Sequence, residues 1–111
     1  MCSFQQLYHD EKTGYVVRCE ACGHIQVCFG NMLLTLDETG FANLCAWVSR
    51  WAEEQLPDQD ESVKAVVIPT PSDGIRLLLN IRELMSLHNM LEFADAELKS
   101  LEMMKLFTIT E

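Results

Sequence analysis

The chain holds one close pair of cysteines, in the segment Cys-Glu-Ala-Cys-Gly-His at residues 19–24. Two thiolates at this spacing can coordinate one metal ion, and the glycine lets backbone amides point at the sulfurs, as in a zinc knuckle. The same spacing also occurs in redox dithiols. Because a structural zinc site needs four ligands, the pair by itself does not decide between these chemistries. A metal-free turn with two small side chains is the third interpretation.

The residues around this pair predict an antiparallel β-meander over Phe4–Leu36. Stretches rich in β-branched and aromatic residues alternate with turn signals, and Gly30-Asn31 is typical of a two-residue hairpin. The strands are expected at 4–8, 15–18, 24–29 and 32–36. The expected pairings are Tyr8 with Tyr15, Gln5 with Arg18, Arg18 with Gly23 and Phe29 with Met32.

This pairing predicts that residues from distant stretches meet at one end of the meander. They are Cys2, Cys19, Cys22, His24 and Asp37. A slip of one residue would turn side chains to the other face without separating the strand ends. We therefore expect a zinc ion, or another soft divalent ion, held by Cys19 and Cys22 together with two of Cys2, His24 and Asp37.

A thiol redox reaction at Cys19 and Cys22 is the alternative chemistry. The start of a helix after Asp37 is expected beside the pair, and a helix N-terminus lowers the pKa of a nearby thiol. The Asp37 carboxylate acts against this effect. Redox pairs normally open a helix in a βαβ unit, whereas this pair joins two strands, which disfavours the redox interpretation.

The remaining thiols and imidazoles do not extend this site. Cys28 and His9 belong to the opposite end of the meander, Cys45 lies on the apolar stripe of a predicted helix, and His88 lies beside the final helix seam. The chain has no G-x-S-x-G, P-loop, G-x-G-x-x-G or H-E-x-x-H motif. The sequence therefore predicts no catalytic residues.

After the meander the apolar period changes from 2 to 3.6, which predicts a helix over 38–55 with Asp37 as its cap. Its apolar stripe is Phe41, Leu44, Cys45, Val48, Trp51 and Ala52. A hairpin of 63–69 and 75–79 follows, and Asn80 with Glu83 predicts the start of a long last helix. We expect one α+β domain over residues 1–111, with both helices on one face of the sheet.

The last helix carries an a/d heptad seam, which predicts a packed helix face. The seam consists of Leu84, Leu87, Leu91, Ala94, Leu98 and Leu101. Packing against the chain's own sheet is one interpretation. We also expect the far end, Glu92 to Phe107, to pack against a second copy, because Met103 and Met104 add apolar surface there.

Charge and composition narrow the function classes. The chain has 111 residues, 17 acidic and 8 basic side chains and a net charge of −9. Such a chain lacks the basic patch that nucleic acids and anionic membranes require, but suits a basic protein partner. No signal peptide or membrane-spanning run is visible, and five cysteines is an odd number. We therefore expect a cytoplasmic protein with reduced thiols.

Four features together resemble an uncharacterised family of small bacterial proteins, a family defined by a domain of unknown function. They are the Cys19-x-x-Cys22 pair, Phe29-Gly30-Asn31, Phe41 in a helix, and Ile68-Pro69-Thr70. The resemblance implies a cytosolic bacterial protein without an assigned activity. The predicted function is a non-enzymatic, acidic protein-interaction or regulatory module with a zinc knuckle, and the alternative is a thiol redox protein.

Overall fold

The computed structural model describes residues 3–54, 62–64, 66–70 and 74–109, and the side chains up to residue 106. Their order is four strands, a helix, two strands and a helix, as the sequence predicts. The elements are β1 (Phe4–Asp10), β2 (Gly14–Cys19), β3 (Ile25–Phe29), β4 (Met32–Leu36), α1 (Glu38–Glu54), β5 (Val66–Pro69), β6 (Arg76–Leu79) and α2 (Ile81–Ile109).

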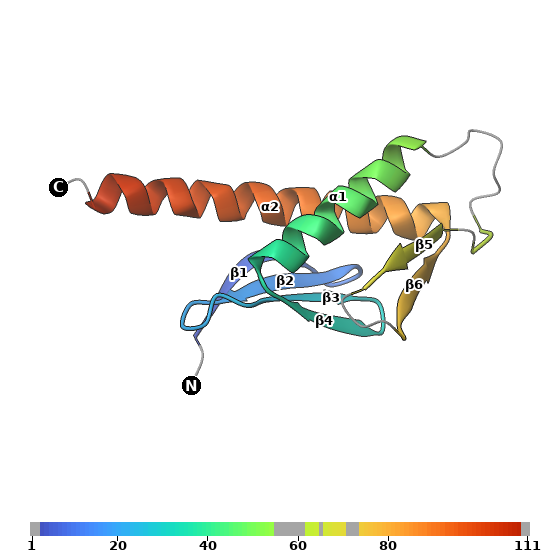
Figure 1. The fold of residues 1–111 in the computed structure, drawn as a ribbon, viewed down its shortest axis with the longest axis horizontal. Helices are drawn as coiled ribbons and strands as arrows, with labels where there is room; N and C mark the ends of the chain where they lie inside the picture. The colour runs from blue at the N-terminus through green and yellow to red at the C-terminus, as the bar shows by residue number, and fades with distance from the viewer. Residues whose placement is uncertain (1–2, 55–61, 65, 71–73, 110–111) are drawn as a thin grey trace.

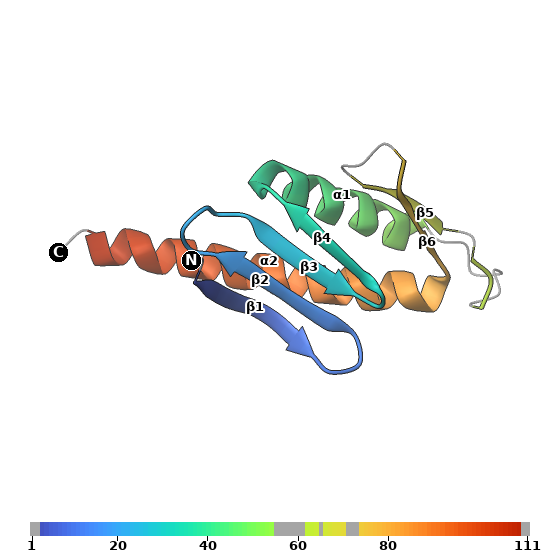
Figure 2. The ribbon, with the colours of Figure 1, turned by 90° about the horizontal axis from the view of Figure 1, so that it is seen from below.

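The first four strands form an antiparallel sheet in the order β1-β2-β3-β4, and both helices cover one face of it (Figure 1). Helix α2 packs on β1 and β2, while α1 packs on β4 and on the separate β5–β6 hairpin. From below, the four strands lie in front of both helices (Figure 2). The predicted α+β class and the placement of the helices are confirmed.

The hairpin of β2 and β3 differs from its predicted register by one residue on each strand. Cys19 closes the hairpin with His24, so Arg18 pairs with Ile25 and not with Gly23. The cause is Gly23, which has a φ of 78° and therefore belongs in the loop and not in a paired strand. Because the strand period is two, the combined shift keeps each side chain on its predicted face.

Strand β1 contains a β-bulge at Leu7. Gln6 pairs with Val17 and Tyr8 pairs with Val16, so Leu7 has no partner of its own. The predicted pairing of Tyr8 with Tyr15 is therefore wrong, although that of Gln5 with Arg18 is confirmed. The bulge turns both Leu7 and Tyr8 toward α2. Leu7 is buried in the core, and the centroid of the Tyr8 ring lies 6.0 Å from the centroid of the Phe93 ring.

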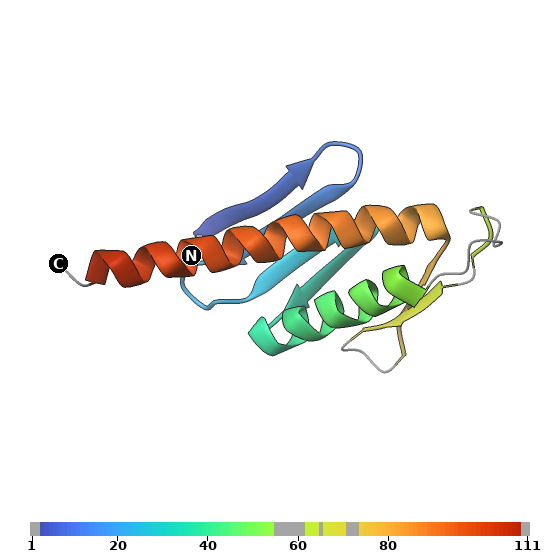
Figure 3. The ribbon, with the colours of Figure 1, turned by 90° about the horizontal axis from the view of Figure 1, so that it is seen from above.

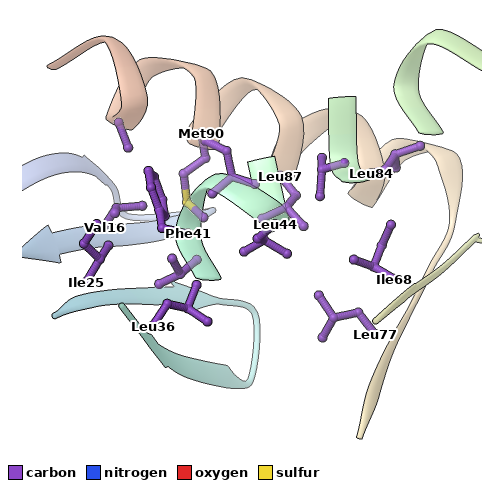
Figure 4. Close-up of a cluster of buried hydrophobic side chains, with 14 of the residues drawn as sticks. Val16, Ile25, Leu36, Phe41, Leu44, Ile68, Leu77, Leu84, Leu87 and Met90 are labelled. Carbon is purple, nitrogen blue, oxygen red and sulfur yellow. The ribbon is translucent and has the colours of Figure 1, made fainter. Parts of the chain in front are cut away.

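The core lies between the sheet and the two helices (Figure 4). It joins Val16, Ile25, Val27 and Leu36 of the sheet with Phe41, Leu44 and Val48 of α1 and Leu84, Leu87 and Met90 of α2. The prediction that Trp51 belongs to the buried apolar stripe of α1 is wrong, since 39% of its surface is exposed. It lies in the last turn of α1, near the helix end at Glu54.

Helix α2 begins with a capping box, as predicted. The Asn80 Oδ1 accepts the Glu83 N–H at 2.8 Å, and the Glu83 Oε1 accepts the Asn80 N–H at 3.0 Å. The packed face of α2, defined as Leu84, Leu87, Leu91, Ala94 and Leu98, is buried against the chain's own core. Leu101 is half-buried, and residues 102–106 are all exposed. The helix thus continues beyond the sheet (Figure 1).

Candidate functional site

The cysteine turn, defined as residues 19–24, joins β2 to β3. Its backbone is closed by two hydrogen bonds of 2.8 Å, from the Cys19 N–H to the His24 carbonyl and from the Gly23 N–H to the Cys19 carbonyl. Cys19 is buried, whereas Cys22 and His24 are exposed. The turn therefore presents one thiol to solvent and encloses the other.

The predicted meeting of chain segments at this turn holds for the backbone. The Glu20 N–H donates to the Ser3 carbonyl at 2.8 Å, which ties the start of β1 to the turn. The Arg18 Nη2 lies 3.0 Å from the Glu38 Oε1, which places the first turn of α1 beside the end of β2. Cys2, a predicted ligand, lies outside the described residues.

Asp37 has a structural role in this arrangement. Its Oδ1 accepts the Gly40 N–H at 2.6 Å, and its carbonyl accepts the Phe41 N–H at 2.9 Å. It is thus the cap of α1, as the sequence predicts. Within the ranges that the structure describes, no three His, Cys, Asp or Glu side chains lie close enough together to hold a metal ion. Zinc at this turn stays a prediction, and four ligands would require Cys2 together with a rearrangement of the side chains of the turn.

A second cluster of chemistry-bearing side chains lies between the helices. Cys45, Ser49, His88, Glu92 and Asp95 are among the residues that line a cavity of about 220 Å³. His88 Nε2 lies 3.4 Å from Glu92 Oε1. Burial, together with the nearby Asp95 charge, raises the pKa of Cys45 to about 12. Cys45 therefore stays a protonated thiol at neutral pH and is a poor nucleophile.

The different environments of Cys22 and Cys45 predict that an alkylating reagent modifies the two thiols at different rates. In the folded protein at pH 8, iodoacetamide is expected to modify Cys22 at least tenfold faster than Cys45, because Cys22 is exposed and Cys45 is half-buried with a raised pKa. Mass spectrometry of peptides after timed quenching measures both rates. In denaturant the two rates should converge, and equal rates in the folded protein would contradict the prediction.

Helix α2 also has an outer face, defined as Ser86, Asn89, Phe93, Ala96, Ser100 and Met103. These residues repeat at the alternating spacing of three and four that is typical of a coiled-coil seam. Each of them lies two positions after a residue of the heptad seam that runs from Leu84 to Leu101, and two positions turn a helix by about 200°. The outer face therefore points away from the core, except that the ring of Phe93 borders Tyr8 of β1. No segment among the described residues lies over α2 when it is viewed from above (Figure 3).

The outer face exposes large apolar side chains. Phe93 is 68% exposed and Met103 is 58% exposed. Asn89, Glu92, Phe93 and Ala96 line a shallow hollow of about 230 Å³. Sequence reasoning missed this repeat because small and polar residues occupy most of its positions, whereas the leucines of the packed face dominate the pattern. The signal was the spacing alone.

The family to which the chain belongs follows from a family model that matches residues 1–110. The chain belongs to DUF6686, a family of unknown function. The match confirms that the protein is a member of an uncharacterised family. No curated protein and no solved structure matches this DUF6686 chain.

Among the described residues, no helix combines the length and the apolar character needed to cross a membrane.

Proposed function

We propose that this DUF6686 protein is a non-enzymatic interaction module that binds a second copy of itself through the outer face of α2. The observation that carries the proposal is the exposed repeat of Phe93, Ala96, Ser100 and Met103 opposite the face that the core already uses. A helix with two seams can pack on its own sheet and on another helix at the same time.

Burial of the outer face supplies a driving force for this association. Phe93 and Met103 expose most of their apolar surface, and removing such surface from water stabilises a complex by about 25 cal/mol per Å². The small residues Ala96 and Ser100 leave room for a second helix to approach closely. Packed-face residues such as Leu87 and Leu91 are already buried and do not contribute to a second interface.

The charge of the chain disfavours nucleic acid and anionic lipid surfaces as partners. It also repels a second copy as a whole, so apolar burial and local pairing of opposite charges must supply the association. A net charge of −9 repels nucleic acid and anionic lipid surfaces, since binding to either requires clustered basic side chains. Exposed Lys and Glu side chains beside the outer face favour a polar rim around an apolar centre, which is typical of protein interfaces. A cytoplasmic location with reduced thiols is part of this proposal.

Replacing Phe93 with serine tests the proposal. Sedimentation equilibrium of the wild-type chain at micromolar concentration should give twice the monomer mass of 12.7 kDa. The F93S variant should raise the dissociation constant at least tenfold, because it removes the largest exposed side chain of the face. Phe4→Ser is the matched control, since Phe4 is also exposed but lies on β1. A wild-type monomer, or equal weakening by both variants, would refute the proposal.

A structural zinc ion at the cysteine turn is the second candidate function, with Cys19, Cys22, His24 and Cys2 as ligands. Binding would have to draw the Cys19, Cys22 and His24 side chains together, because no three such groups lie within reach of one metal ion among the described residues. The hydrogen bond from Glu20 to Ser3 favours it, because it ties the residue next to Cys2 in the chain to the turn. Metal analysis of protein purified without chelator should give one zinc per chain, and loss of metal should destabilise the fold. A zinc content near zero with unchanged stability in chelator would exclude the ion.

The alternative of a thiol redox protein is tested by replacing Cys19 and Cys22 with serine. The interaction-module proposal expects the variant to keep its self-association wherever it folds, because the cysteine turn is not part of the outer face. Intact folding with loss of a measurable thiol–disulfide exchange activity would support the redox alternative instead.

A further inference from the structure

We infer that the two copies meet with their α2 helices antiparallel, in the register that places Phe93 of one copy against Ala96 of the other. The inference rests on the proposed self-association and specifies its geometry. In this register Asn89 faces Ser100 and Ser86 faces Met103, each pair occurring twice by symmetry.

Side-chain sizes along the outer face favour this arrangement. Each large side chain meets a small one, Phe93 against Ala96 and Met103 against Ser86, and the polar Asn89 meets the polar Ser100. In a parallel pair in register, each residue would meet its own copy. Phe93 would then crowd Phe93 while Ala96 left a gap against Ala96, and interfaces with uneven packing are less stable.

Charges beside the outer face select the same orientation. Glu92 and Lys99 each precede an outer-face residue and lie on the flank nearest α1, since both charges act on Cys45. Glu97 follows Ala96 on the opposite flank. In an antiparallel pair like flanks meet, so Glu92 lies near Lys99 of the second copy, twice. In a parallel pair unlike flanks meet, so Glu92 would repel Glu97 twice.

The register is also selected by charge. Moving the antiparallel pair by one heptad, so that Ser100 faces Ala96, brings Lys99 close to Lys99 of the second copy and Glu97 close to Glu97. Both contacts are repulsive. The register with Phe93 against Ala96 instead joins opposite charges. Within the single chain Lys99 Nζ lies 2.8 Å from Asp95 Oδ2 and Glu92 Oε1 lies 3.4 Å from His88 Nε2, but 66% of the Glu92 side chain and 72% of the Lys99 side chain stay accessible to a second copy.

The space around α2 and its length fit this geometry. The sheet lies behind α2 and α1 lies beside it, so a second helix can approach from the open side (Figure 3). In the antiparallel pair, the exposed end of α2 at residues 102–106 runs along the first turns of the second copy's α2. The extension of the helix beyond its own sheet then has a packing partner.

Charge reversal tests the orientation. Glu92→Lys and Lys99→Glu should each weaken the dimer about tenfold, because each turns two attractive contacts into repulsive ones. The double variant E92K/K99E should return to within about twofold of the wild type. An equimolar mixture of the two single variants should form heterodimers that are tighter than either homodimer. Glu102→Lys, which makes the same charge change away from the outer face, is the matched control.

The outcomes separate this inference from the proposed function. A parallel dimer would be strengthened by E92K, since the introduced ammonium group would then attract Glu97 of the second copy. This result would overturn the antiparallel geometry while leaving the self-association intact. Monomers for the wild type and every variant would overturn both. Helix content from circular dichroism should be the same in all variants, which shows that the changes act between chains.

Discussion

Replacing Gly14 with alanine is expected to destabilise the protein by about 3 kcal/mol or more, since it combines backbone strain with a clash. Gly14 has a φ of 142°, a conformation that residues with a side chain rarely adopt. A Cβ at this position would lie 1.9 Å from the backbone oxygen of Cys28 and 2.9 Å from its carbonyl carbon. Because both are backbone atoms in β3, the sheet itself would have to move. Urea unfolding followed by circular dichroism measures the effect.

Gly30→Ala is the matched control for this variant. Gly30 also has a positive φ, of 58°, but nothing lies within 4 Å of a Cβ built there. Its substitution is expected to cost about 1–2 kcal/mol, which is the strain of the left-handed conformation alone. If the two variants lost the same stability, the close approach of Gly14 to β3 would not be the cause.

Phe41→Ala is expected to cost about 3–5 kcal/mol of unfolding free energy, the usual range for removing a fully buried aromatic side chain. Phe41 is 2% exposed and lies between the sheet and α2, close to Met90 (Figure 4). The cavity left behind would touch both layers of the core. Urea unfolding should show a lower midpoint with an unchanged m-value.

The exposed Phe4 provides the comparison for Phe41. Phe4→Ala removes the same atoms from a position that is 52% exposed on β1, and is expected to change the free energy of unfolding by less than about 1 kcal/mol. A Phe41→Ala variant as stable as Phe4→Ala would mean that α1 does not pack on the sheet as described.

Features of this fold that depend on local chemistry could be predicted from the sequence. Asp37 caps α1, Asn80 and Glu83 cap α2, and Gly30-Asn31 turns between β3 and β4, because each requires only neighbours in the chain. The heptad of leucines likewise identified the packed face of α2.

Features that depend on tertiary packing could not be predicted. The bulge at Leu7 exists because two successive side chains of β1 approach α2, and no local pattern marks it. The exposure of Trp51 follows from its place in the last turn of α1, although its spacing matches the stripe. Gly23 signalled a turn, but its place inside the loop moved the closing pair from Arg18 to Cys19.

The candidate zinc site shows where such reasoning stops. The meander topology correctly brings the backbone near Ser3, Cys19 and His24 together, because strand ends are fixed by pairing alone. Outside the paired strands, where Cys22 and Asp37 lie, pairing does not fix the direction of a side chain. Cys19 is buried while Cys22 is exposed, and the Asp37 carboxylate caps a helix. Residues predicted to lie at the same end of a sheet are therefore good evidence for the fold, but weaker evidence that their side chains bind one metal ion.

Isotope-filtered NOE spectroscopy on a mixture of labelled and unlabelled chains tests the proposed self-association most directly, because it detects only contacts between copies. The antiparallel α2 pair predicts cross-peaks between the Phe93 ring of one copy and the Ala96 methyl of the other, and between Met103 and Ser86. Absence of any contact between copies at millimolar concentration would contradict self-association through the outer face of α2.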